Sequence, residues 1–137
     1  DNVHFPGLMP QESVVKWMFK AKCMLLVLKN VPVLDTSSPN KLFDAFAVGL
    51  PVIQVTQGWI KDMMKRENCG ITVPPDDPEA MAGAITEVIG NTELRNTLKE
   101  NSRRAAREIF DQGMLADKMR SAIMSVARPA ENERSGL

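Results

Sequence analysis

The sequence has no net charge, a single histidine and only two cysteines, and each of these features excludes some classes of function. Its 17 lysines and arginines are balanced by 17 aspartates and glutamates, so the basic excess that nucleic-acid binding favours is absent. Cys23 and Cys69 lie among apolar residues and show no disulfide or metal-site spacing, which predicts two reduced, buried thiols. His4, the only histidine, is interpreted as structural, and no carboxylate–histidine cluster has the spacing of metal ligands. We therefore expect no metal, no cofactor and no nucleic-acid partner.

Long hydrophobic runs are absent as well. No stretch approaches the ~20 apolar residues that a membrane-spanning helix needs, and no signal peptide is visible. These absences favour a cytosolic protein. The 137 residues fit one domain, and the 44% that are hydrophobic suffice for a core. Because the first residues already resemble a strand, we expect the chain to begin in the middle of a fold.

Apolar periodicity predicts strands that alternate with helices. The expected strands are 3–5, 23–28, 51–56 and 70–74, and the expected helices are 11–21, 39–48, 59–67, 78–89, 93–109 and 114–127. Trp17 and Met18 are interpreted as core residues, and the apolar run 23–28 as a buried parallel strand. Asp77 is expected to cap the helix that follows it. This order predicts an α/β fold, a parallel sheet with helices on both faces, over residues 1–128, followed by a polar tail at 129–137.

Three loops follow predicted strands, at 6–10, 29–38 and 56–58. The carboxyl ends of parallel strands share one edge of the sheet, and ligands of such sheets bind there. The three loops are therefore expected to converge on one binding edge.

The segment 37–53 compresses a loop, a helix and a strand into one stretch. A serine is expected to cap the helix and Pro39 to occupy its first position. Gly49 is expected to end the helix in a left-handed conformation. The helix N-terminus, with Lys41 one turn in, is a candidate phosphate site, and Asp44 is a candidate acceptor for hydroxyl groups.

The stretch DAFAVGLPVI at 44–53 resembles the signature of GT-B glycosyltransferases, specifically the large retaining family, of the glycosyl transferases group 1 type, that builds bacterial polysaccharides. In that family an acidic residue followed by A-x-A-x-G-x-P-V-I, or a close variant, marks the donor-binding helix of the C-terminal domain. Further resemblance lies at 2–10, 58–60, 68–73 and 76–82, in the family's order, so that roughly residues 1–127 are covered. Five pieces in sequence make a specific match.

The resemblance implies a Rossmann-like, nucleotide-sugar-binding domain that is an incomplete half of a GT-B C-terminal domain. It assigns the nucleotide base to the loop Gly7, Leu8 and Met9. It assigns the sugar and diphosphate to the remaining candidate residues, which are Thr36, Ser37, Ser38, Pro39, Asn40, Lys41, Leu42 and Asp44. Asp44 falls at the position that would bind the ribose hydroxyls.

One departure from the family concerns Thr36. Many members carry two glutamates separated by seven residues, with the second at the position of Asp44, and the first would fall on Thr36. Threonine offers a hydroxyl but no charge, and aspartate reaches less far than glutamate. This departure favours an alternative in which the domain binds a sugar nucleotide without catalysis.

The implied reaction transfers a sugar from a nucleoside diphosphate, with UDP expected, to a saccharide or lipid-linked acceptor in cell-surface polysaccharide synthesis. The catalytic base is unknown, and the N-terminal acceptor domain is expected to be missing, so the fragment alone should be inactive. A lipid-linked acceptor would bring the cytoplasmic enzyme to the inner face of the membrane. Two further alternatives stay open: a sugar-nucleotide epimerase of the same fold, whose acidic and histidine catalysts are not found, and a receiver-like signalling domain, whose clustered acids are also missing.

Two other expectations concern surfaces. The helix 93–109 carries Arg95, Lys99, Arg103, Arg104 and Arg107, which form either a solvated face or a site of attraction to anionic lipid headgroups.

The strands from 23, 52 and 71 can form a contiguous sheet, whereas the strand at Val3 would stand apart. An open apolar edge at 23–28 would be adhesive, so we expect it to be covered by a longer native chain, a moved Val3 strand or a second copy in a homodimer.

Overall fold

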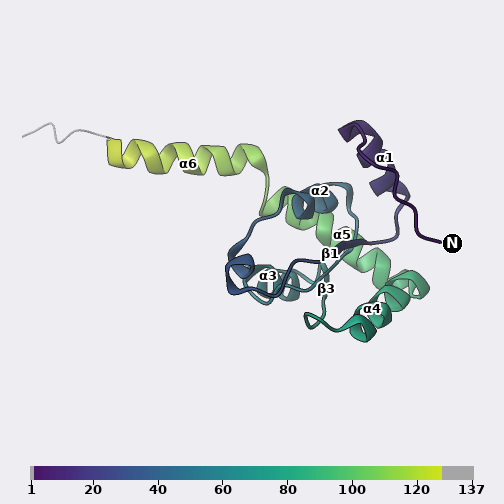
Figure 1. The fold of residues 1–137 in the computed structure, drawn as a ribbon. Helices are drawn as coiled ribbons and strands as arrows, with labels where there is room; N and C mark the ends of the chain where they lie inside the picture. The colour runs from purple at the N-terminus through teal and green to yellow at the C-terminus, as the bar shows by residue number, and fades with distance from the viewer. Residues whose placement is uncertain (1, 128–137) are drawn as a thin grey trace, which may run out of the picture.

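The computed structural model describes residues 2–127, and its centre is a three-stranded parallel sheet (Figure 1). The strands are β1 (Met24–Leu26), β2 (Val52–Gln54) and β3 (Gly70–Thr72), in the order β1-β2-β3. Leu25 pairs with Ile53, and Ile53 pairs with Ile71. The predicted α/β fold with a parallel sheet is confirmed.

Residues 2–127 also contain six α-helices and one 3₁₀ helix. They are α1 (Gln11–Lys20), η1 (Pro32–Thr36), α2 (Asn40–Val48), α3 (Trp59–Glu67), α4 (Pro78–Gly90), α5 (Thr92–Glu108) and α6 (Gln112–Ala127). All six predicted helices are present within two residues of their expected bounds, whereas η1 lies in a segment expected to be a loop. None of these helices is long and apolar enough to cross a membrane. The expected polar tail at 129–137 lies outside the described residues.

The hydrophobic core has two parts, one on each face of the sheet. Val52 contributes to the cluster that α2, α3 and α5 cover, and its neighbour Ile53 contributes to the cluster under α4. Successive strand residues point to opposite faces, so these two adjacent side chains serve opposite halves of the core. Helix α5 joins the halves, because Ala105 packs in the first cluster and Leu98 in the second.

The strand expected at 3–5 does not form. Residues 2–10 contain no strand, and the side chains of Val3 and Phe5 are 65% and 93% exposed. An isolated extended segment gains little without a neighbouring strand to pair its backbone groups, and the described sheet ends at β1. The prediction of a fourth strand in this chain was wrong.

The apolar run 23–28 is only partly buried. Leu26 is fully buried, but Leu25 and Val27 are exposed. The cause is that β1 is an edge strand, paired with β2 alone. The expected open apolar edge is therefore present in the single chain, and no strand of residues 2–10 covers it. Its covering by a longer native chain or by a second copy stays a prediction.

Of the two α1 residues that were interpreted as core, one is packed in the core and the other is exposed. Met18 packs against the main cluster, as expected, whereas Trp17 is 62% exposed and that interpretation was wrong. A helix that docks through one narrow stripe leaves the positions on either side of the stripe in solvent. Helix α6 also buries none of its residues and projects away from the rest of the molecule (Figure 1).

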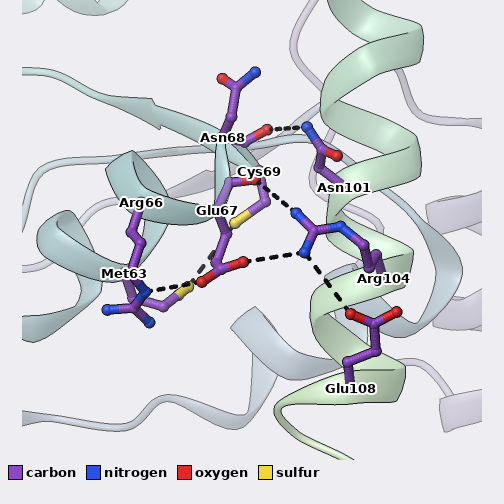
Figure 2. Close-up of polar contacts among 8 residues, drawn as sticks. All are labelled: Met63, Arg66, Glu67, Asn68, Cys69, Asn101, Arg104 and Glu108. Atoms are coloured by element: carbon purple, nitrogen blue, oxygen red, sulfur yellow. Dashed lines mark hydrogen bonds and ion pairs between the residues drawn. The ribbon is translucent and has the colours of Figure 1, made fainter.

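Helix α5 is fastened to the end of α3 by polar contacts (Figure 2). Arg104 donates to both the Glu67 carboxylate, at 3.3 Å, and the Glu67 carbonyl, at 3.4 Å. Ser102 and Asn101 donate to the carbonyls of Cys69 and Asn68, each at 2.9 Å. These donors satisfy carbonyl groups that the end of α3 leaves without helical partners.

Two side chains in this contact have shifted pKa values. The hydrogen bond from Arg66 is the main cause that lowers the pKa of Glu67, and Arg104 adds to it. Burial raises the pKa of the Cys69 thiol to about 12. A thiol of that pKa stays protonated and unreactive at neutral pH, and Cys69 is buried and free, as expected. Cys23 is a free, half-buried thiol.

A first testable prediction concerns the end of α2. Gly49 has a φ of 70°, and a Cβ there would lie 2.5 Å from Nε of Arg103. We expect Gly49→Ala to lower the free energy of unfolding by about 1–2 kcal/mol, because a side chain is strained in the left-handed region. Urea unfolding measures the effect, and Gly90→Ala, where no atom lies within 4 Å, is the control. Equal stability of the two variants would contradict the strain.

Candidate functional site

The segments that follow β1, β2 and β3 meet at the carboxyl edge of the sheet. The backbone N–H of Gln57 donates to Oδ1 of Asp35 at 2.8 Å, which joins the segment after β2 to η1. Asn30 Nδ2 donates to Oδ2 of Asp76 at 3.3 Å, which joins the segments after β1 and β3. The expected convergence of 29–38 with 56–58 is confirmed.

The third expected loop, at 6–10, is not part of this network. No strand precedes it, the Leu8 side chain is fully exposed, and no atom lies within 4 Å of where a Cβ of Gly7 would be. The site role of Gly7, Leu8 and Met9 stays a prediction, without the strand that was expected to place them.

Under the edge lies a buried polar group that supports the segment after β2. Gln54 is fully buried, and its Nε2 donates to the Thr72 hydroxyl at 2.7 Å and to the Thr56 carbonyl at 2.9 Å. Among the described residues, no buried side-chain nitrogen or oxygen lacks a hydrogen-bond partner. A satisfied network of this kind fixes a backbone in place, so Gln54 positions the segments that follow β2 and β3 at the carboxyl edge of the sheet.

The indole of Trp59 sets the position of the segment before α2. Its Nε1–H donates to the Ser37 carbonyl at 2.8 Å. Its ring stacks on Phe43, with centroids 6.4 Å apart and planes 18° apart, and Phe110 packs against both rings. Trp59 is therefore part of the packing around the main hydrophobic cluster. The hydrogen bond to Ser37 was not foreseen.

The N-terminus of α2 begins without a side-chain cap, so the expected serine cap was wrong. Pro39 is the N-cap residue rather than the first helical residue, and it makes no side-chain bond. The hydroxyls of Ser37 and Thr36 donate to the carbonyls of Leu34 and Val33, at 2.7 and 2.8 Å. Both hydroxyls therefore bond to carbonyls of η1, a helix that the sequence did not predict, and not to the start of α2.

An uncapped helix start leaves donors open to solvent. The Leu42 N–H donates to the Pro39 carbonyl at 3.0 Å, while the N–H groups of Asn40 and Lys41 have no protein acceptor among the described residues. Ser38, Asn40 and Lys41 are exposed, so these donors are accessible. Leu42 is fully buried, so only its backbone can face a ligand. A phosphate group is well suited to such a helix start.

Asp44 is exposed on α2 and faces a cavity of about 500 Å³ between α2 and α5. Arg103 and Arg107 line the same cavity. A second cavity of about 380 Å³ places Asn40 beside Asp44, with Gln11 and Gln112. The structure therefore brings Asn40 and Asp44 to one hollow, and Thr36 lines neither cavity. Within residues 2–127, no group of three or more potential metal ligands is present.

Comparisons with known proteins agree with this architecture. The chain is 32% identical over 107 residues to D-inositol 3-phosphate glycosyltransferase of Jonesia denitrificans, in an alignment that covers 78% of this chain and 24% of that protein. It is 24% identical over 129 residues to the putative colanic acid biosynthesis glycosyltransferase WcaL of Salmonella typhimurium, in an alignment that covers 92% of this chain and 32% of that protein. The chain therefore spans about a quarter to a third of these relatives.

A solved structure and a family model give the same result. Sucrose-phosphate synthase from Thermosynechococcus elongatus superposes with a TM-score of 0.74 at 25% identity, over 90% of this chain and 30% of that one. The Rossmann-like fold expected from the resemblance is thereby confirmed. The model of the glycosyl transferases group 1 family matches residues 1–91, which include β1, β2, β3 and the whole of α2. On this match, the chain belongs to the glycosyl transferases group 1 family.

Proposed function

We propose that this chain is the donor-binding part of the C-terminal domain of a retaining glycosyltransferase. The donor would be a nucleoside-diphosphate sugar, with UDP as the expected nucleotide. The observation that carries the proposal is the uncapped start of α2, held at the carboxyl edge of the sheet by the bond from Trp59 to Ser37. Family membership supports sugar transfer as the chemistry.

In this proposal the diphosphate is bound by the start of α2. The free N–H groups of Asn40 and Lys41 would donate to phosphate oxygens, and the Lys41 ammonium would neutralise charge as the diphosphate leaves. These donors are fixed before the reaction, which is what makes electrostatic stabilisation effective. Asp44, one turn further along, would accept hydrogen bonds from the ribose hydroxyls.

The acceptor and the catalytic base belong to parts of the enzyme that this chain does not supply. One relative is named for action on inositol 3-phosphate and another for colanic acid biosynthesis. The first name supports a hydroxylated acceptor, and the second supports a role in polysaccharide synthesis. Within the proposal, the acceptor is a saccharide or a lipid-linked sugar on the cytoplasmic side of the membrane. A separate N-terminal domain would complete the site, so the chain alone should bind a donor weakly and transfer nothing.

Isothermal titration of the chain with UDP, GDP and UDP-sugars tests the proposal. We expect weak, saturable binding with a preference for UDP. A clear preference for a phosphorylated sugar that lacks a nucleotide would overturn it.

A second candidate is a sugar-nucleotide-binding domain without catalysis. Thr36 favours it, because this exposed residue stands where many family members carry a glutamate and its hydroxyl already donates to the Val33 carbonyl. Restoring the acid by Thr36→Glu in the complete protein separates the two candidates. Transfer that is absent before the change and present after it would favour the non-catalytic candidate.

A prediction for the diphosphate contact follows. We expect Lys41→Ala to weaken UDP binding about tenfold, since a charge-assisted hydrogen bond contributes roughly 1.5 kcal/mol. Binding of uridine, which has no phosphate, should not change. Lys65→Ala, on the exposed side of α3, is the control. Equal losses for UDP and uridine would show that Lys41 does not contact the phosphates.

A prediction for the ribose contact concerns Asp44. We expect Asp44→Asn to weaken UDP binding about fivefold, because a neutral amide accepts hydrogen bonds less strongly than a carboxylate. The 2′,3′-dideoxy analogue should bind both proteins equally, since it has no ribose hydroxyls to donate. Titration of both ligands measures the difference, and an identical loss for both would remove this role.

A further inference from the structure

A second polar hollow lies at the opposite, amino edge of the sheet. It is a cavity of about 160 Å³ between the end of α1, the segment that enters β2 and one face of α5. We call it the basic pocket, because its charged lining residues are all cationic: Lys20, Lys22, Arg95, Lys99 and Arg103. The chain as a whole has no net charge, so this local excess of positive charge is balanced by acidic residues elsewhere.

Two of these cations already have structural roles. Arg95 donates to the carbonyls of Val88 and Ile89, at 2.9 and 2.8 Å, and so completes the end of α4. Arg103 donates to the Val48 carbonyl at 3.3 Å, at the end of α2. Cations at helix C-termini are stabilising, so helix capping accounts for both arginines.

Capping does not account for the three lysines. Lys20, Lys22 and Lys99 make no side-chain hydrogen bond or ion pair within residues 2–127, since the salt bridges there involve Arg66, Arg104 and Arg120. Lys99 also lies four residues from both Arg95 and Arg103, and like charges at that spacing destabilise a helix. The pocket therefore gathers charge at a cost to stability.

One exposed aromatic side chain lines the pocket, and a second lies two residues away on α1. Phe19 lines it and is 65% exposed, and Trp17 is 62% exposed on the same helix. Between them, Met18 packs into the core and anchors α1 to the body of the domain. Exposed aromatic rings beside lysines are typical of surfaces that lie in the interfacial region of a membrane.

We propose that this face, the basic pocket together with Trp17 and Phe19, binds a membrane surface that contains anionic phospholipids. The headgroup phosphate enters the basic pocket, and the two aromatic rings insert among the headgroups. Charge complementarity identifies the occupant, because all the charged residues of the lining are cationic. The face lies at the edge opposite to the start of α2. Arg103 also lines the cavity that Asp44 faces, but the three lysines line neither cavity beside Asp44, so a test at the lysines does not depend on the donor site.

The experiment is vesicle co-sedimentation of the chain with pure phosphatidylcholine and with phosphatidylcholine containing phosphatidylglycerol. We expect binding to the anionic vesicles only, and weaker binding as salt is raised. The triple variant Lys20→Gln, Lys22→Gln and Lys99→Gln should bind on the order of 100-fold more weakly. The control with the same charge change is Lys29→Gln, Lys65→Gln and Lys118→Gln, which are exposed lysines outside the pocket.

A spectroscopic measurement separates insertion from simple attraction. The emission of Trp17 should shift to shorter wavelength when anionic vesicles are added, and Trp17→Phe should abolish that shift. The proposal is overturned by equal binding to neutral vesicles, or by equal loss in the two triple variants at unchanged melting temperatures. It is likewise overturned if free glycerol phosphate or a single-stranded oligonucleotide binds at the pocket while anionic vesicles do not.

Discussion

Replacing Trp59 with alanine is expected to lower the free energy of unfolding by about 3–4 kcal/mol and to abolish UDP binding. The stability loss follows from removing a large ring that packs against Phe43 and Phe110. The binding loss follows because the indole N–H holds the Ser37 carbonyl just before the start of α2. Urea unfolding followed by circular dichroism measures the first effect, and titration with UDP measures the second.

Two further variants show which part of Trp59 matters. Trp59→Phe keeps most of the packing but removes the indole N–H donor, so we expect about 1 kcal/mol of destabilisation. Its UDP affinity should still fall, although most of the stability is kept. Trp17→Ala, on an exposed ring, should change stability by less than about 0.5 kcal/mol. If Trp59→Phe bound UDP as tightly as the unsubstituted chain, the hydrogen bond would have no part in shaping the site.

Much of the fold could be predicted from local signals. Proline and glycine mark the limits of α2, and the left-handed Gly49 is where the pattern placed it. Asp77 accepts from the Ala80 N–H at 2.9 Å, which is the expected helix cap. These features depend on residues close in sequence, and for that reason a single sequence suffices to predict them.

The errors in the fold have a common origin in long-range contacts. Residues 3–5 have a strand-like pattern but no partner strand, and Trp17 lies on a helical face that no other element covers. Local pattern describes what a segment can bury, and only the assembled chain decides what is buried. The same reason explains the open edge at β1, where Val27 is exposed despite its apolar neighbours.

For the candidate site, the sequence predicts the position but not the supports. The parallel sheet implied that 29–38 and 56–58 would meet, and they do. The contacts of Asp35 with Gln57 and of Trp59 with Ser37 each join residues 22 positions apart, and no spacing rule predicts such pairs. The 3₁₀ helix that takes up the hydroxyls of Thr36 and Ser37 was likewise invisible, because its five residues carry no periodic signal.

The second large effect is expected at Gly58, which lies between β2 and α3. A Cβ on Gly58 would collide with the carbonyl oxygen of Asp35, and it would also lie 2.9 Å from Asp35 Cβ. The obstruction includes backbone atoms, so it cannot be relieved by turning a side chain. We expect Gly58→Ala to lower the free energy of unfolding by about 2–3 kcal/mol and to weaken UDP binding, since η1 must move away from Gln57.

The matched control for Gly58 is another glycine of the same chain. Gly83 lies on the exposed side of α4, and a Cβ there would have no atom within 4 Å, so Gly83→Ala should raise stability by about 0.5–1 kcal/mol. The same substitution is thus expected to have opposite signs at the two positions. Urea unfolding of both variants measures the signs, and titration with UDP should show a loss for Gly58→Ala alone. A Gly58→Ala variant as stable as the unsubstituted chain would mean that the segment after β2 and η1 are not in close contact in solution.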